Sequence, residues 1–70
     1  MGKQTFHEGE QVSWKSHGGE AVGRVEEKIT VETDAAGRAV KASAEDPQYL
    51  VRSAKSGGEA VHRPEALHKN

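Results

Sequence analysis

The sequence predicts an all-β fold in which five short strands curl into a small barrel, followed by a short helical turn. Glycine and proline interrupt the 70-residue chain so often that no interval suits a long helix. The apolar residues are mainly valine, which fits a pleated sheet better than a helix. These residues recur at every second position in several short runs, which is the period of a half-buried strand.

The expected strands lie, in chain order, near residues 11–15, 20–32, 38–43, 48–53 and 59–62. In the first strand, Val12 and Trp14 alternate with polar residues. The second is long, and Gly23 within it is expected to mark a bulge or a bend that lets the sheet curl. Asp34-Ala35-Ala36-Gly37 is typical of a hairpin loop. Pro64 is expected to begin the C-terminal helical turn.

The inward positions of these strands define the predicted core. It consists of Phe6, Val12, Trp14, Val25, Ile29, Val31, Val40, Tyr49, Val51, Val61 and Leu67. Each such side chain contributes roughly 1.5–3 kcal/mol on burial. Because a chain this short buries only about 60% of its unfolded surface, the three aromatic rings are needed inside. Phe6, Trp14 and Tyr49 are therefore expected to be core residues rather than a binding site.

The composition limits the classes of protein to which the chain can belong. The chain has no cysteine, which excludes disulfides and thiolate metal sites and fits a cytoplasmic location. Ten basic and eleven acidic residues balance, whereas nucleic-acid-binding domains are usually strongly basic. No secretion signal and no apolar run of about 20 residues is present, so no membrane association is expected. Residues 1–70 are expected to form one domain, ordered over about 6–67, and to be monomeric rather than oligomeric.

Several short motifs together resemble a known family. They are Phe6-x-x-Gly9-Glu10-x-Val12-x-Trp14, Gly18-Gly19, Gly23-x-Val25, Glu45-Asp46-Pro47-Gln48-Tyr49 and Gly58-Glu59-Ala60-Val61-His62-x-Pro64-x-x-Leu67. The set is similar to the hypervirulence-associated Tudor domain family of bacteria and fungi. The resemblance extends from Phe6 to Leu67 and implies a stand-alone, five-stranded SH3-like (Tudor-like) barrel. It implies no particular activity.

Polar residues on the loops and strand ends are the candidate binding residues. They are Asp46, Gln48, Arg52, His62 and Arg63. His62 is expected to bond the backbone or a carboxylate such as Asp46 or Glu65. The histidines lack metal-ligand spacing, so neither a metal site nor a cofactor is expected.

No nucleophile motif or phosphate-binding glycine loop is present, so no catalytic residue and no enzyme activity is expected. A plasmid-borne dihydrofolate reductase uses a barrel of this size and a similar Phe-x-x-Gly start. The pore-lining Val-Gln-Ile-Tyr segment of that enzyme is replaced here by Ala60-Val61-His62-Arg63, so its glutamine and tyrosine are absent and this activity is not expected.

The leading hypothesis is a module that binds a protein or peptide through a strand edge or a groove beside the loop 44–48. The alternative is nucleic-acid binding through a basic face formed by residues 38–63.

Overall fold

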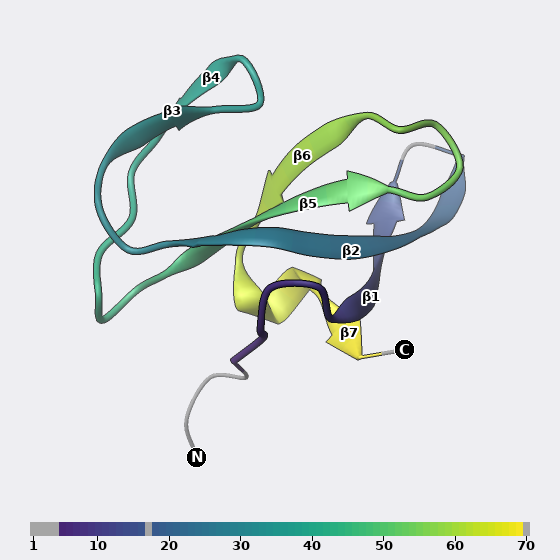
Figure 1. Cartoon of the computed structure of the whole chain (residues 1–70), viewed down its shortest axis with the longest axis horizontal. Helices are drawn as coiled ribbons and strands as arrows, with labels where there is room; N and C mark the ends of the chain where they lie inside the picture. Colours follow the sequence, from purple (N-terminus) through teal and green to yellow (C-terminus); the bar gives the residue numbers. More distant parts are fainter. Residues whose placement is uncertain (1–4, 17, 70) are drawn as a thin grey trace.

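Strand β2 (Gly19–Ile29) is the longest element of the computed structural model, which describes residues 5–16 and 18–69. It pairs with β1 (Gln11–Ser16) on one side and with β5 (Gln48–Ser53) on the other. Strand β6 (Glu59–His62) extends the sheet beyond β5, and β7 (His68–Lys69) extends it beyond β1. The resulting antiparallel sheet has the order β6-β5-β2-β1-β7 and is strongly bent (Figure 1). A 3₁₀ turn, η1 (Pro64–Ala66), joins β6 to β7.

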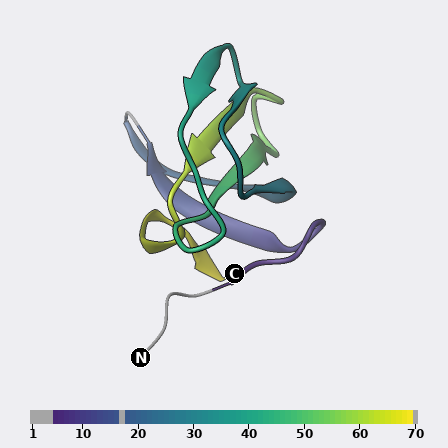
Figure 2. The same cartoon turned by 90° about the vertical axis from the view of Figure 1, so that its left-hand side faces the viewer.

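A second, two-stranded sheet lies between β2 and β5 in the sequence. It is the hairpin of β3 (Thr33–Ala35) and β4 (Arg38–Val40), which forms a sheet of its own and projects at the top of the molecule in both views (Figures 1 and 2). Its two central residues, Ala36 and Gly37, have φ values of 52° and 76°. Two left-handed residues in a two-residue loop match the twist of an antiparallel pair. The predicted hairpin loop is therefore confirmed.

The all-β prediction and the C-terminal helical turn are confirmed, and two strand assignments need correction. The predicted strand 20–32 ends at Ile29, and the predicted strand 38–43 is shortened to Arg38–Val40 and pairs with β3 alone. The fifth strand of the main sheet is instead β7, which was not predicted because two residues carry no alternation. Within the described residues no pairing joins the edge strands β6 and β7, so closure into a barrel stays a prediction.

Gly23 and the bulge of β2 are separate features. The pairing register with β5 shifts between Val25 and Glu27, so the extra residue is Glu26 and not the glycine. Gly23 is instead required by close packing. A Cβ there would overlap the carbonyl oxygen of Arg52 and lie 2.8 Å from Cη2 of Trp14. The glycine thus allows β2 to sit between the Trp14 ring and the β5 backbone.

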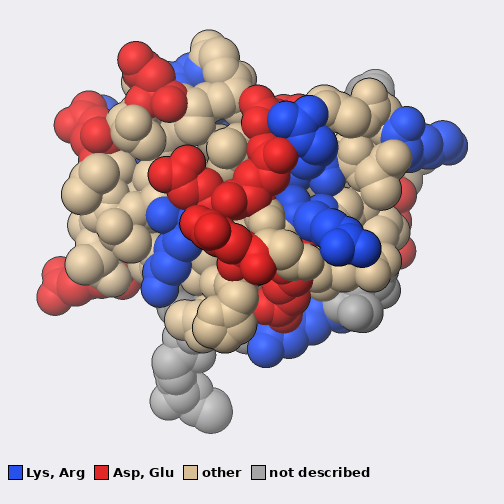
Figure 3. Space-filling model, in the orientation of Figure 1, with Lys and Arg blue, Asp and Glu red and all other residues tan. Residues whose placement is uncertain are grey.

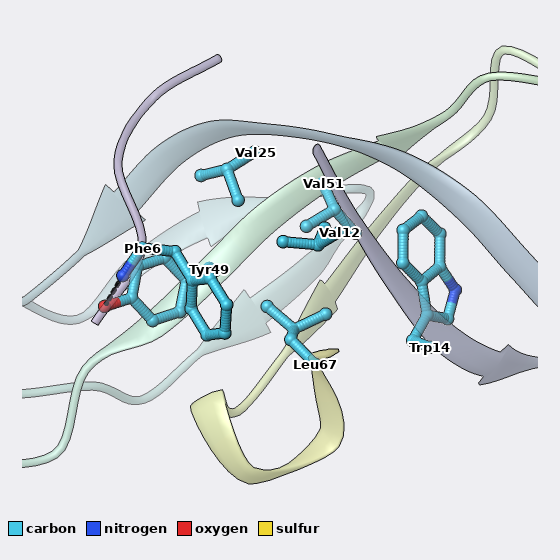
Figure 4. Packing of buried hydrophobic residues seen from close by; sticks show 7 residues of the cluster. All are labelled: Phe6, Val12, Trp14, Val25, Tyr49, Val51 and Leu67. Atoms are coloured by element: carbon cyan, nitrogen blue, oxygen red, sulfur yellow. Dashed lines mark hydrogen bonds between the residues drawn. The ribbon is translucent and has the colours of Figure 1, made fainter. Parts of the chain in front are cut away.

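The main core cluster fills the concave side of the bent sheet. Figure 4 shows Phe6, Val12, Trp14, Val25, Tyr49, Val51 and Leu67 pointing toward one another. The Phe6 and Tyr49 rings meet edge to face, with centroids 5.3 Å apart, a geometry favoured between aromatic rings. The Phe6 backbone N–H donates to the Tyr49 hydroxyl at 3.2 Å, so the buried hydroxyl is paired. Leu67, which follows η1, closes the open end of this cluster.

A smaller cluster fixes the base of the β3–β4 hairpin. Ile29, Val40 and Val61 are buried there, with Leu50 packed against them. Val31 was predicted to be buried, and this prediction is wrong: its side chain is 66% exposed. The reason is that β2 ends at Ile29. Beyond it the chain leaves the sheet toward the hairpin, so alternate side chains no longer point to the core.

No helix in the described part of the chain is long and apolar enough to cross a membrane.

We expect Gly23→Ala to destabilise the fold by about 1–3 kcal/mol, the usual range for overpacking. The added methyl group must displace either the backbone of β5 or the Trp14 ring. Urea unfolding followed by circular dichroism measures the loss. Gly58→Ala is the matched control, because a Cβ at Gly58 would meet only the Ser56 hydroxyl oxygen, at 3.4 Å. Equal unfolding midpoints for the two variants would contradict the close-packing role.

Candidate functional site

Arg52 is the centre of a surface ion cluster on the outer side of the sheet. Its Nε donates to Oε2 of Glu26 at 2.6 Å, and one terminal nitrogen donates to Oε2 of Glu59 at 3.2 Å. The other terminal nitrogen donates to the carbonyl oxygen of Gly57 at 2.8 Å. The guanidinium therefore links β2, β5, β6 and the turn between β5 and β6. Arg52, predicted as a binding residue, has most of its donors occupied within the protein.

The pKa values of the two carboxylates in this cluster move in opposite directions. The hydrogen bond from Arg52 holds the pKa of Glu26 below its ordinary value of 4.5. The neighbouring Glu26 carboxylate raises the pKa of Glu59, since two carboxylates share one cation. Glu26, at the shorter distance, keeps its charge more readily. All three side chains face solvent, so the cluster connects strands while adding only modest stability.

Gln48 and Asp46 hold the loop that precedes β5. The Gln48 amide donates to the carbonyl oxygen of Lys41 at 2.7 Å, closing the loop. The Asp46 N–H donates to the hydroxyl and carbonyl oxygens of Ser43, each at 3.1 Å. The Ser43 N–H donates back to the Asp46 carbonyl oxygen at 3.2 Å. A hollow of about 240 Å³ lies beside them, lined by Lys41, Ala42, Ser43 and Asp46. It is small for a peptide groove, although it lies near the predicted loop 44–48.

His62 lies partly buried on β6, opposite Tyr49. Its ring packs against Trp14 with centroids 5.5 Å apart. Its Nε2 atom is buried and has no hydrogen-bond partner within residues 5–16 and 18–69, so the predicted bond to a carboxylate is not seen at this nitrogen. Burial lowers the pKa of His62 below 6.5, and the positive charge of Arg38 lowers it further. The imidazole is therefore neutral at pH 7.

Arg63 is exposed at the start of η1, where its carbonyl oxygen accepts from the Ala66 N–H at 3.0 Å. Among the hollows formed by the described residues, Arg52 lines one and Asp46 another. Over the described residues, no group of three or more histidine, aspartate or glutamate side chains could hold a metal ion.

A concave surface lies along β2, where sequence reasoning did not place a site. The segment after β5 continues alongside β2, with the Ala54 N–H donating to the Val22 carbonyl oxygen at 2.8 Å (Figure 1). Three hollows of about 470, 490 and 120 Å³ adjoin there, and Ala54 lines all three. We call this surface the β2 groove: it runs between residues 19–26 and residues 52–57, with Gly9 and Gln11 at one side.

The β2 groove combines an apolar hollow with charged walls. The 490 Å³ hollow is lined mainly by apolar surface, with Arg24, Glu26 and Arg52 around it. The 470 Å³ hollow carries the hydroxyls of Ser16, Ser53 and Ser56 together with Glu20 and Lys55. Such a mixture of apolar surface and a few polar groups is typical of a binding site.

The sequence contained one signal of this groove. Val22 and Arg24 alternate on the outward face of β2, and a Ser- and Gly-rich turn follows β5. The contact between that turn and β2 spans distant parts of the chain. Periodicity within either segment could not indicate it.

We expect Glu26→Gln to lower the urea midpoint at pH 7 more than Glu59→Gln does. The lowered pKa of Glu26 means that its contribution is complete above pH 4.5 and is lost as the pH falls through its folded-state pKa. The raised pKa of Glu59 means that its contribution is complete below pH 4.5 and is lost as the pH rises through its folded-state pKa. Urea titrations at pH 7 and pH 4 measure both effects. A larger loss for Glu59→Gln at pH 7 would contradict the assignment.

We expect the fold to lose stability as the pH falls below 6.5, and His62→Gln to remove part of that loss. Since the folded-state pKa of His62 is lowered, its contribution is complete above 6.5 and disappears as the imidazole takes up a proton. Urea midpoints between pH 8 and pH 5, read by circular dichroism, measure the slope. His7→Gln, the same exchange at an exposed position, is the matched control. An unchanged slope in His62→Gln would refute this role.

Comparison with known proteins agrees with the resemblance noted in the sequence. The model of the family described as the Tudor domain of hypervirulence-associated proteins matches residues 9–67. Searches of curated proteins and of solved structures found no match. The matched range runs from the turn before β1 to Leu67, and so includes the β2 groove and every member of the main core cluster except Phe6. The chain belongs to the hypervirulence-associated Tudor domain family.

Proposed function

We propose that this protein is a non-enzymatic, monomeric interaction module that binds an extended protein segment or peptide in the β2 groove. Tudor-like domains are generally non-catalytic binding modules. The observation that carries the proposal is the meeting of three hollows at Ala54, over the longest strand of the sheet. A groove along a strand suits an extended ligand, whose alternate side chains reach successive hollows. The cysteine-free composition fits a cytoplasmic setting for this interaction.

The proposed scaffold is a five-stranded SH3-like barrel. Three features support this architecture: β7 returns to pair with β1, the bulge at Glu26 bends β2, and Leu67 closes the core. Bulges increase the local twist of a strand, which is how small sheets curl. The β3–β4 hairpin is then an insertion between β2 and β5 and leaves the groove open.

The charge distribution favours a peptide over a nucleic acid. Acidic and basic side chains interleave on the face shown in Figure 3, with carboxylates running through its middle. Within the predicted basic segment 38–63, Arg52 is already paired with two carboxylates. A phosphate backbone needs several unopposed cations, because counterion release supplies most of its affinity. The interleaved charges of this face supply few unopposed cations.

Selection from phage-displayed random dodecapeptides tests the proposed function. We expect enriched peptides to bind Ala54→Arg at least about tenfold more weakly than wild type, a loss of about 1.4 kcal/mol. The new side chain would fill the point where the three hollows meet. Ala39→Arg is the matched control, since Ala39 is an exposed alanine on β4 outside the groove. Failure to enrich any peptide, or equal binding by Ala54→Arg, would overturn the proposal.

A further inference from the structure

Arg24 is an uncompensated cation in the β2 groove. Its exposed side chain lines both the 490 Å³ and the 120 Å³ hollows. Within residues 5–16 and 18–69, the guanidinium has no ion-pair or hydrogen-bond partner. Arg52, on the neighbouring strand, is bound by three acceptors. The two arginines of the groove therefore differ. Arg52 links strands within the protein, and Arg24 is available to a ligand.

The strand register explains why Arg24 has no carboxylate beside it. Arg24 lies opposite Gln11 on β1, which is neutral, and opposite Arg52 on β5, which has the same charge. Like charges directly opposite each other on a sheet are unfavourable, whereas opposite charges attract. Glu26 and Glu59 are engaged by Arg52. An anionic group brought to Arg24 by a ligand would supply the missing partner.

The surroundings of Arg24 favour a single anionic group. Two glutamates of the same strand also line the groove, Glu20 in the 470 Å³ hollow and Glu26 in the 490 Å³ hollow. A chain of regularly spaced phosphates would bring further negative charges against these carboxylates. A single carboxylate placed at Arg24 avoids repulsion by both Glu20 and Glu26. The guanidinium also matches a carboxylate geometrically, because its planar fork can donate two parallel hydrogen bonds.

Beside Arg24, the 490 Å³ hollow is lined mainly by apolar surface, to which Gly9 and Ala54 contribute. Neighbouring residues of an extended peptide point to opposite faces, and residues two apart share a face about 6.5–7 Å apart. An acidic side chain on Arg24 thus leaves the next side chain on the same face close to this hollow.

We propose that the β2 groove recognises an extended peptide through one aspartate or glutamate bound by Arg24, with an apolar side chain two positions away in the 490 Å³ hollow. The inference rests on the proposed function and names the chemistry of its ligand. Arg24 is the anchor of the acidic residue, and Lys55, at the other end of the groove, plays a lesser part.

Sequencing the random dodecapeptides enriched on wild type and on two variants tests this inference. On wild type we expect aspartate and glutamate at least about threefold above the input library, with an apolar residue two positions away. Arg24→Gln should abolish this preference. Lys28→Gln should keep it, because Lys28 is an exposed cation of the same strand that does not line the groove. Replacing the acid by its amide in an enriched peptide should weaken binding by about tenfold to wild type and little to Arg24→Gln.

The outcomes separate this inference from the proposed function. Enriched peptides that depend on Ala54 but show no acidic preference overturn the inference and leave the function standing. An acidic preference that persists on Arg24→Gln overturns the role of Arg24. Enrichment of no peptide overturns both. Arg24-dependent binding of a fluorescent 20-nucleotide thymidine strand that weakens steeply between about 50 and 200 mM salt overturns the inference in favour of a nucleic-acid ligand.

Discussion

The contact of three strands at Gly23 is the constraint on which the rest of this small fold depends. Gly23 lies between the Trp14 ring on the core side and the Arg52 backbone of β5. Because β2 has no side chain at this point, the Trp14 ring of β1 and the Arg52 carbonyl group of β5 can both lie close to its backbone. The core and the β2 groove are thus separated by little more than one strand's backbone. Stability and the shape of the outer surface are linked through this one residue.

The bulge at Glu26 has a comparable effect on the electrostatics. One extra residue in β2 shifts its register against β5, and the Glu26 carboxylate reaches Arg52. Arg52 then engages Glu26, Glu59 and the Gly57 carbonyl at once. Arg24, which precedes the bulge, faces Arg52 and Gln11 and receives no carboxylate from the residues that the structure describes. The division between a structural arginine and an available one follows from local strand geometry.

Much of the fold could be predicted because the sheet imposes a simple period on the side chains. Val12, Trp14, Tyr49 and Val51 were assigned to the core by alternation, and each is buried. Alternation fails where a segment leaves the sheet, as at Val31. It also fails for β7, whose two residues are a strand only because β1 is beside them. Short elements are defined by their partners and not by their own pattern.

The candidate site was less predictable, because it is made of contacts between distant segments. Polar residues that looked available are engaged within the fold: Arg52 by Glu26 on another strand, and Gln48 by the Lys41 carbonyl oxygen across the preceding loop. The groove at Ala54 arises where the segment after β5 continues beside β2. A side chain's type can be read locally, but whether its donors are occupied depends on what the fold brings next to it.

The amino-acid sequence alone therefore determined the all-β class, most of the strands, the aromatic core and the family resemblance. These properties depend on local period and composition, which need no knowledge of neighbours. Only the tertiary structure decided which cations are paired, which nitrogen of His62 is buried without a partner, and where the surface is hollow. These properties depend on the pairing register of the strands and on which distant segments it places side by side. A shift of one residue in the register would change every cross-strand neighbour.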